Sequence, residues 1–121
     1  MGIFSFFRKN PEKEKSQKFR ELEKLFEDDQ EILNNLKVSW LTERGNTFGG
    51  RGEFDLAVAD FQEAISLKND CLPAYFGIAL CYYQKGEKDR AFELLKTAPE
   101  VMTLHDQVVL RKKDMLAAWR Q

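Results

Sequence analysis

Two stretches of the sequence decide the fold: residues 41–64 read LTERGNTFGGRGEFDLAVADFQEA, and residues 75–98 read YFGIALCYYQKGEKDRAFELLKTA. The second stretch follows the first at an offset of 34 residues. At this offset small residues match small residues, and bulky apolar residues match bulky apolar residues. The matched pairs include Gly45 with Ala79, Phe48 with Tyr82, Ala57 with Ala91 and Phe61 with Leu95. Agreement at one fixed period indicates a structural repeat.

Each stretch has the pattern of two helices joined by a turn. Its small and bulky residues recur at steps of three and four, which places them on one face of a helix. Gly52 and Gly86 fall between the two helices, where glycine accepts the left-handed backbone that commonly ends a helix. Between the two units, Asn69-Asp70 supplies a turn, and Pro73 suits the first turn of the following helix.

The segment before the repeats, residues 12–37, is strongly charged and amphipathic. Its apolar residues recur mostly at steps of three and four, which predicts helix. Acidic residues gather in residues 21–31, although acids are favoured at the start of a helix and bases at its end. We therefore expect a second helix to begin near Asp28 or Asp29, because either side chain can cap its first turn.

The segment after the repeats begins at Pro99, which should end the preceding helix. Thr103 with Asp106 three residues later resembles the capping pair found at a helix start. We expect a final helix from there through Trp119. A third unit at the same offset fits this segment poorly, so we interpret the final helix as a cap that gives the stack a polar outer face.

These residues resemble the tetratricopeptide repeat, whose pattern runs from an aromatic residue through Leu-Gly, Tyr, Gly, Ala, Phe and Ala to a closing Pro. The first unit departs from this pattern because Arg44 stands where Leu is usual, and Asn69 replaces the closing proline. Leu41 holds the aromatic position, with Trp40 one residue before it. The resemblance spans about residues 38–98. The second unit carries the pattern at Tyr75, Ile78-Ala79, Tyr82, Gly86, Ala91, Leu95 and Ala98.

The resemblance implies a fold. One such unit cannot bury its apolar face, and about three are usually needed for stability, so flanking helices should complete the core. We expect an all-α protein without strands: a short right-handed superhelical stack of helical hairpins with flanking N- and C-terminal helices. Residues 1–11 form an apolar and basic tip, and residues 12–121 form a single domain. Within that domain we expect flanking helix at 12–37, repeats at 38–71 and 72–103, and a capping helix at 104–121.

The resemblance also implies a binding surface, because in this family the first helix of each unit lines a concave groove that grips peptides or helices. Its centre, formed here by Phe76, Leu80 and Tyr83, is apolar and aromatic, which favours an amphipathic helix or a short apolar peptide. Alternatively, the chain's own N- or C-terminal helix fills the groove. Carried over to this sequence, the groove residues are Thr42, Asn46, Phe76, Leu80, Tyr83 and Arg111.

One subfamily uses this groove to bind the C-terminal carboxylate of chaperones through lysines, asparagines and an arginine. Asn46 fits one of those asparagines, and Arg111 fits the arginine if the last helix keeps the register. Thr42 and Gln107 stand where the lysines belong, and Gly77 stands where the second asparagine belongs. The groove then offers little charge to a carboxylate, so we expect no such clamp.

The N-terminal tip places four large apolar side chains in five residues, followed by Arg8 and Lys9. Aromatic groups beside bases can bind weakly to a membrane surface, here through residues 3–9. The tip can also tuck into the chain's own core or contact another protein or a second copy. We favour tucking or a protein contact over the membrane.

Composition excludes several classes of function. The chain of 121 residues has 19 basic and 20 acidic residues, so its net charge of −1 argues against nucleic-acid binding. No apolar run approaches the roughly 18 residues that a membrane-spanning helix needs. Cys71 and Cys81 have no metal-ligand spacing and are expected to be reduced thiols. His105 is the sole histidine and lies apart from both, so we expect no catalytic residue, metal or cofactor.

Together these features predict a non-catalytic adaptor or scaffold that holds a peptide or helix of another protein. The alternative is a self-assembling structural protein that forms homo-oligomers through the N-terminal tip or the end helices. The apolar run near the start is short and lacks the preceding basic stretch of a signal peptide. We therefore expect a cytoplasmic protein.

Overall fold

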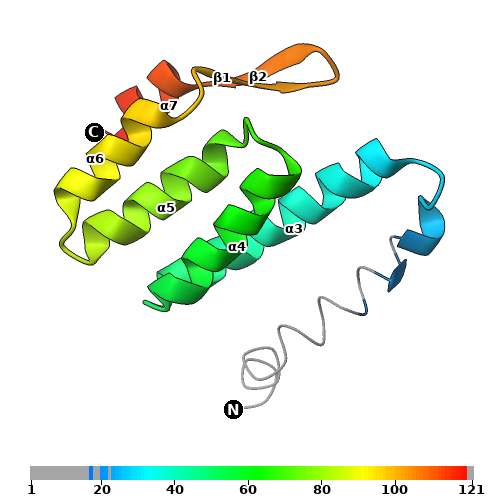
Figure 1. Ribbon diagram of the computed structural model, residues 1–121, viewed down its shortest axis with the longest axis horizontal. Coiled ribbons are helices and arrows are strands. Elements are labelled where there is room, and N and C mark those ends of the chain that lie inside the picture. The colour runs from blue at the N-terminus through cyan, green and yellow to red at the C-terminus, as the bar shows by residue number, and fades with distance from the viewer. Residues whose placement is uncertain (1–16, 18–19, 22, 120–121) are drawn as a thin grey trace. The chain divides into compact units, whose positions relative to one another are not determined.

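The computed structural model describes residues 17, 20, 21 and 23–119. These residues belong to two compact units, residues 1–37 and residues 38–121. The N-terminal tip lies outside the described residues. In chain order the elements are α3 Gln30–Gly50, α4 Phe54–Leu67, α5 Leu72–Gln84, α6 Lys88–Thr97, β1 Val101–Leu104, β2 Gln107–Arg111 and α7 Lys112–Trp119 (Figure 1).

The described part of the first unit contains the start of α3. Asp29 precedes this helix, and its carboxylate accepts a hydrogen bond of 3.1 Å from the backbone N–H of Ile32. The expected helix start near Asp28 or Asp29 is confirmed, because this bond satisfies one of the N–H groups that the first turn leaves free. Within the same unit, Lys37 forms an ion pair of 3.4 Å with Glu23.

The second unit contains two helical hairpins, one from the part of α3 after Val38 together with α4, the other from α5 and α6. Helices α4, α5 and α6 lie side by side in sequence order (Figure 1). Gly52 and Gly86 connect the helices of each hairpin with φ angles of +80° and +91°. The predicted left-handed turns are confirmed. Pro73 lies in the first turn of α5, as expected.

The core of the second unit is built around Phe61, which is 2% exposed. The Phe61 ring lies directly beneath the backbone of α3 at Gly45 and of α5 at Gly77. A Cβ atom added at Gly45 would lie 2.7 Å from the ring, and one added at Gly77 would lie closer still. Side chains of α3, α4 and α5 surround it, including Leu41, Ala57, Ala64, Ile78 and Cys81. Phe61 therefore joins the first hairpin to the second.

A buried ion pair explains why Arg44 departs from the family pattern. The Arg44 guanidinium on α3 donates two hydrogen bonds, of 2.7 and 2.5 Å, to the carboxylate of Asp60 on α4. Both side chains are more than nine-tenths buried. At the 34-residue offset the equivalent residues of the second repeat are Ile78 and Leu94. An ion pair in the first repeat thus occupies the place of an apolar pair in the second.

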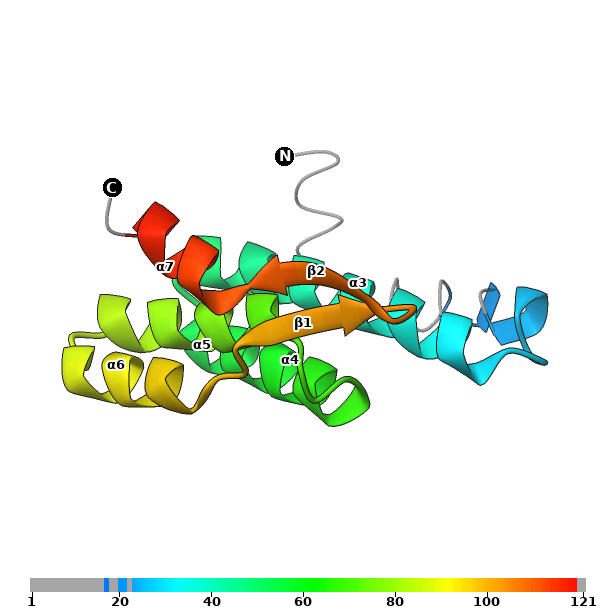
Figure 2. The ribbon, with the colours of Figure 1, turned by 90° about the horizontal axis from the view of Figure 1, so that it is seen from above.

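The described part of the chain is mostly helical, so the all-α class is confirmed, but the expectation of no strand is wrong for residues 101–111. β1 and β2 form an antiparallel two-stranded sheet, which Figure 2 shows beside the helices. Thr103 belongs to β1 and Asp106 to the turn, so they do not cap a helix. The final helix begins at Lys112 instead of near residue 104.

Local chemistry accounts for this hairpin. The strands contain Val, Thr and Leu, and β-branched residues favour strands. His105 and Asp106 both have positive φ, +53° and +63°, as a two-residue hairpin turn requires. Leu104 and Val108 are four residues apart, a spacing that is compatible with one helix and equally with two short strands.

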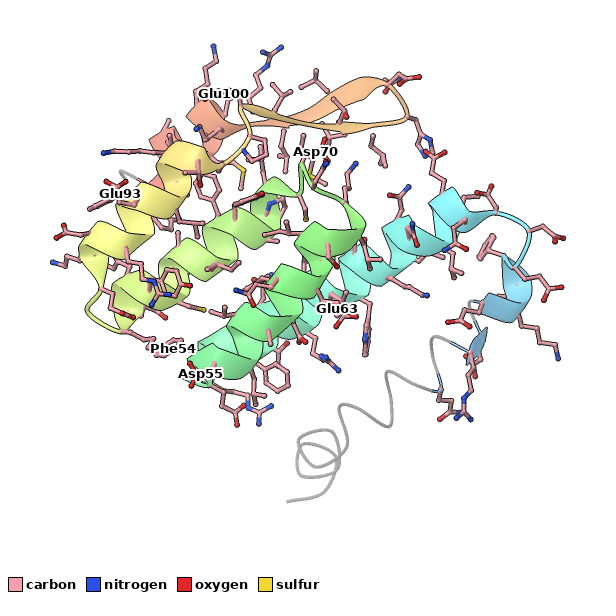
Figure 3. The ribbon with its side chains drawn as sticks, in the orientation of Figure 1. Phe54, Asp55, Glu63, Asp70, Glu93 and Glu100 are labelled. Atoms are coloured by element: carbon pink, nitrogen blue, oxygen red, sulfur yellow. The ribbon has the colours of Figure 1, made fainter. Side chains whose placement is uncertain are left out.

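Two side chains from the α4–α5 connection hold the hairpin in place. The Asp70 carboxylate accepts hydrogen bonds from the Thr103 backbone N–H at 2.9 Å and from its hydroxyl at 3.1 Å. The Lys68 ammonium donates to the Thr103 carbonyl at 2.6 Å. Asp70 lies where this connection meets the sheet (Figure 3). Partial burial raises the pKa of Asp70, but the bonds from Thr103 and Lys68 outweigh it, and the pKa is below its ordinary value.

The start of α7 caps the end of α6. Lys112 is 7% exposed, and its ammonium donates to the carbonyls of Leu95 and Ala98 at 3.1 and 3.0 Å. It also forms an ion pair of 3.1 Å with Glu100, in the α6–β1 connection (Figure 3). Leu95 lies in the last turn of α6 and Ala98 is its C-cap residue, and a cation is favoured there by both hydrogen bonding and the helix dipole.

We expect Lys112→Met to lower the free energy of unfolding by about 2 kcal/mol, because two carbonyls lose a charged donor that methionine cannot replace. Urea unfolding followed by circular dichroism measures this change. Lys113→Met, at the exposed neighbouring lysine, is the matched control and should stay within about 0.5 kcal/mol of wild type. Equal effects of the two substitutions would contradict the capping role.

Candidate binding face

Two adjoining hollows mark one face of the second unit. The larger, which we call the end pocket, has a volume of about 490 Å³ and is formed by α5, α6 and α7. Its lining is apolar and aromatic. The side chains that form it are Leu80, Tyr83, Phe92, Leu95, Leu116 and Trp119.

The smaller hollow, which we call the glycine groove, has a volume of about 280 Å³ and lies between α3 and α5. Phe61 contributes to its wall, and the amide side chains of Asn46 and Gln84 border it. Leu80 lines both hollows, so the groove and the end pocket meet at this residue. The residues of the groove are Gly45, Asn46, Gly49, Gly50, Phe61, Gly77, Leu80, Cys81 and Gln84.

The structure brings together three of the residues named from the sequence. Leu80 and Tyr83 line the end pocket and are 43% and 40% exposed. Asn46 is exposed and lines the glycine groove. Helix α5 positions Leu80 and Tyr83, because residues three apart lie on the same side of a helix.

Phe76 does not belong to an open groove. It is 5% exposed, and its ring packs edge-on against Trp119 of α7 with 5.6 Å between the ring centres. At this one position the chain's own helix α7 covers the residue named for the groove. Leu116 of α7 also packs on this core.

Thr42 and Arg111 lie outside both hollows. The Thr42 hydroxyl is 3.0 Å from the carbonyls of Val38 and Ser39, so it bonds to its own helix. Arg111 is the last residue of β2 and pairs with Val101 of β1. Its assignment to the groove is wrong because it required residues 104–111 to be helical.

Four residues of the end pocket were not named as groove residues: Phe92, Leu95, Leu116 and Trp119. The repeat offset contains a signal for Phe92, since its equivalent in the first repeat is Val58, which packs against the core. Among the described residues no helix covers Phe92 as α5 covers the first hairpin, and its side chain is 50% exposed. Trp119 was expected on the last helix, but its place beside α5 depends on where that helix begins.

The second unit contains both cysteines of the chain. Cys81, in the glycine groove, and Cys71 are free and buried. Burial raises the pKa of both thiols, so they remain protonated and weakly nucleophilic at neutral pH. Within the described residues, no group of His, Cys, Asp and Glu side chains is arranged to hold a metal ion.

The search for membrane spans also covers only the described part of the chain. There, no helix combines the length and apolar character that crossing a bilayer requires.

Comparison with known proteins agrees with this fold. A family model described as the tetratricopeptide repeat matches residues 50–108, which include α4, α5, α6 and β1. Neither the curated proteins nor the solved structures that were compared show a match. Proteins with this repeat generally mediate interactions between proteins. The chain therefore contains a tetratricopeptide repeat within residues 50–108.

Proposed function

We propose that this protein is a non-catalytic adaptor that holds a peptide or helix of another protein on the face formed by the glycine groove and the end pocket. The observation that carries the proposal is the junction of the two hollows at Leu80, which gives one segment of a partner a continuous apolar track. Tyr83 and Phe92 add aromatic surface, with 6.4 Å between their ring centres.

The amount of exposed apolar surface supports this proposal. Leu80, Tyr83, Phe92 and Trp119 are each at least 36% exposed and all line the end pocket. Large apolar groups gathered in one hollow are typical of interaction sites, whereas single exposed ones are ordinary. Tyr and Trp frequently dominate binding energy at interfaces. The buried free thiols fit a reducing compartment, and we propose the cytoplasm as the location.

A capture experiment tests this function. The full chain is immobilised, and proteins retained from an extract of the source cells are compared between wild type, Leu80→Asp and Tyr83→Ala. We expect the retained partner to fall by more than about tenfold for Leu80→Asp, because a charge would enter the apolar track. Tyr83→Ala should give a smaller loss.

The matched control is Leu56→Asp, which places the same charge on an exposed leucine of α4 outside both hollows. Circular dichroism verifies that all variants are folded. If folded Leu80→Asp and Tyr83→Ala retain every partner that wild type retains, the binding face is wrong.

A further inference from the structure

The end pocket lies on the surface that the α5–α6 hairpin presents to α7, which we call the seam. Helix α7 already covers one part of this seam. α7 starts beside the last turn of α6, where Lys112 bonds to the carbonyls of Leu95 and Ala98. It ends at Trp119, which packs on Phe76 and lines the end pocket. Phe76 of α5 is buried beneath this contact, whereas Leu80 and Tyr83, further along α5, are 43% and 40% exposed.

The preceding repeat shows what fits such a seam. At the 34-residue offset, Phe92 and Leu95 of the end pocket correspond to Val58 and Phe61 on α4. There an α-helix, α5, covers the surface, and Gly77 lies directly on the Phe61 ring. The α5–α6 hairpin presents the surface equivalent to the one that α5 covers on the first hairpin. We therefore expect the uncovered part of the α5–α6 surface to accept a helix.

The rim of the end pocket carries a positive charge. The Lys88 ammonium lies 5.3 Å from the centre of the Tyr83 ring and, among the residues that the structure describes, forms no ion pair with a carboxylate. On α6, Lys88 shares a face with Phe92 and Leu95, four and seven residues further on. Asp89 and Glu93 lie roughly 100° or more around the helix from Lys88, and Glu93 pairs with Lys96.

We infer that the end pocket binds an amphipathic α-helix of a partner protein, with its apolar side on Leu80, Tyr83 and Phe92 and an acidic residue against Lys88. The inference rests on the proposed function and specifies the form and the charge of the partner segment. The partner helix lies next to α7 on the seam. Its carboxylate pairs with the Lys88 ammonium, which has no carboxylate partner within the described residues.

Three synthetic peptides of 14 residues test this inference by fluorescence anisotropy with the full chain. The first has leucines at helical spacing, glutamates beside them and alanines at the remaining positions. The second replaces the glutamates by lysines, and the third has the composition of the first with one central alanine changed to proline. We expect the acidic helix to bind more than about tenfold more tightly than the proline peptide, because proline breaks the helix. The lysine peptide should bind about threefold to fivefold more weakly than the acidic one.

Variants of the protein separate shape from charge. Leu80→Asp should abolish binding of the acidic peptide. Lys88→Glu should remove or reverse the preference for the acidic peptide over the lysine peptide. Lys96→Glu, which changes the same charge on another side of α6, should leave that preference unchanged.

The outcomes distinguish this inference from the proposed function. If the proline peptide binds as well as the acidic helix, or if Lys88→Glu leaves the preference unchanged, the inference is overturned, while loss of cellular partners by Leu80→Asp still supports the proposed function. Failure of the acidic peptide to bind at about 1 mM, the concentration range of weak interactions, also overturns the inference. So does a dimer of the chain that Leu80→Asp disperses, since a second copy would then occupy the pocket.

Discussion

Replacing Arg44 by isoleucine is expected to lower the free energy of unfolding by about 3–5 kcal/mol, because the Asp60 carboxylate would remain buried without its partner. The Arg44 guanidinium makes two hydrogen bonds to this carboxylate, and both side chains are more than nine-tenths buried. Chemical denaturation followed by circular dichroism at pH 7 measures the loss.

The second repeat supplies the rescue for this substitution. Ile78 and Leu94 occupy the equivalent positions there, so Arg44→Ile with Asp60→Leu rebuilds an apolar pair that the fold already contains. We expect the double variant to recover most of the loss, to within about 1–2 kcal/mol of wild type, as apolar replacement of buried ion pairs commonly does. A loss below about 1 kcal/mol for Arg44→Ile alone would contradict a structural role for the pair.

Gly77→Ala is expected to lower the free energy of unfolding by about 3 kcal/mol, the upper part of the range for overpacked cores. The added methyl group would overlap the Phe61 ring, and the ring cannot retreat because Gly45 lies against it as well. The melting temperature and the urea midpoint measure the change.

Gly50→Ala provides the matched control for this prediction. It adds the same methyl group to a helical glycine, but nothing lies within 4 Å of the new atom. Since alanine favours helix over glycine by up to about 1 kcal/mol, this variant should be as stable as wild type or more stable. Combining Gly77→Ala with Phe61→Leu should cost less than the sum of the two single changes, because the smaller side chain makes room. Simple additivity would show that the overlap with Phe61 is not the cause.

The two helical hairpins could be predicted from the sequence because each signal is local or repeated. Gly52 and Gly86 mark the turns by their backbone freedom, Pro73 marks the start of α5, and the 34-residue offset supports both units. The hairpin at residues 101–111 could not be predicted in the same way. Its short apolar segments match helical and strand spacing equally well, and tertiary contacts to Thr103 from Asp70 and Lys68 help to hold the strands.

The residues of the candidate site could be predicted only where the secondary structure and the contacts around them were local. Leu80, Tyr83 and Asn46 lie in segments whose secondary structure was correctly predicted, and the structure places all three in the two hollows. Arg111 was assigned to the groove on the assumption that residues 104–111 are helical, but it lies at the end of β2. Phe76 lies on the expected helix, but whether it is open depends on Trp119, 43 residues further along the chain, and spacing within one helix carries no information about such a contact.

The buried ion pair of Arg44 and Asp60 also affects how the two similar hairpins find their proper neighbours. If α3 paired with α6, Arg44 would face Leu94, and if α5 paired with α4 in the place of α3, Ile78 would face Asp60. Either exchange leaves a desolvated charge unmatched, which is strongly unfavourable. Repeat proteins are prone to such misassembly during folding, and the buried charged pair penalises the wrong order of helices.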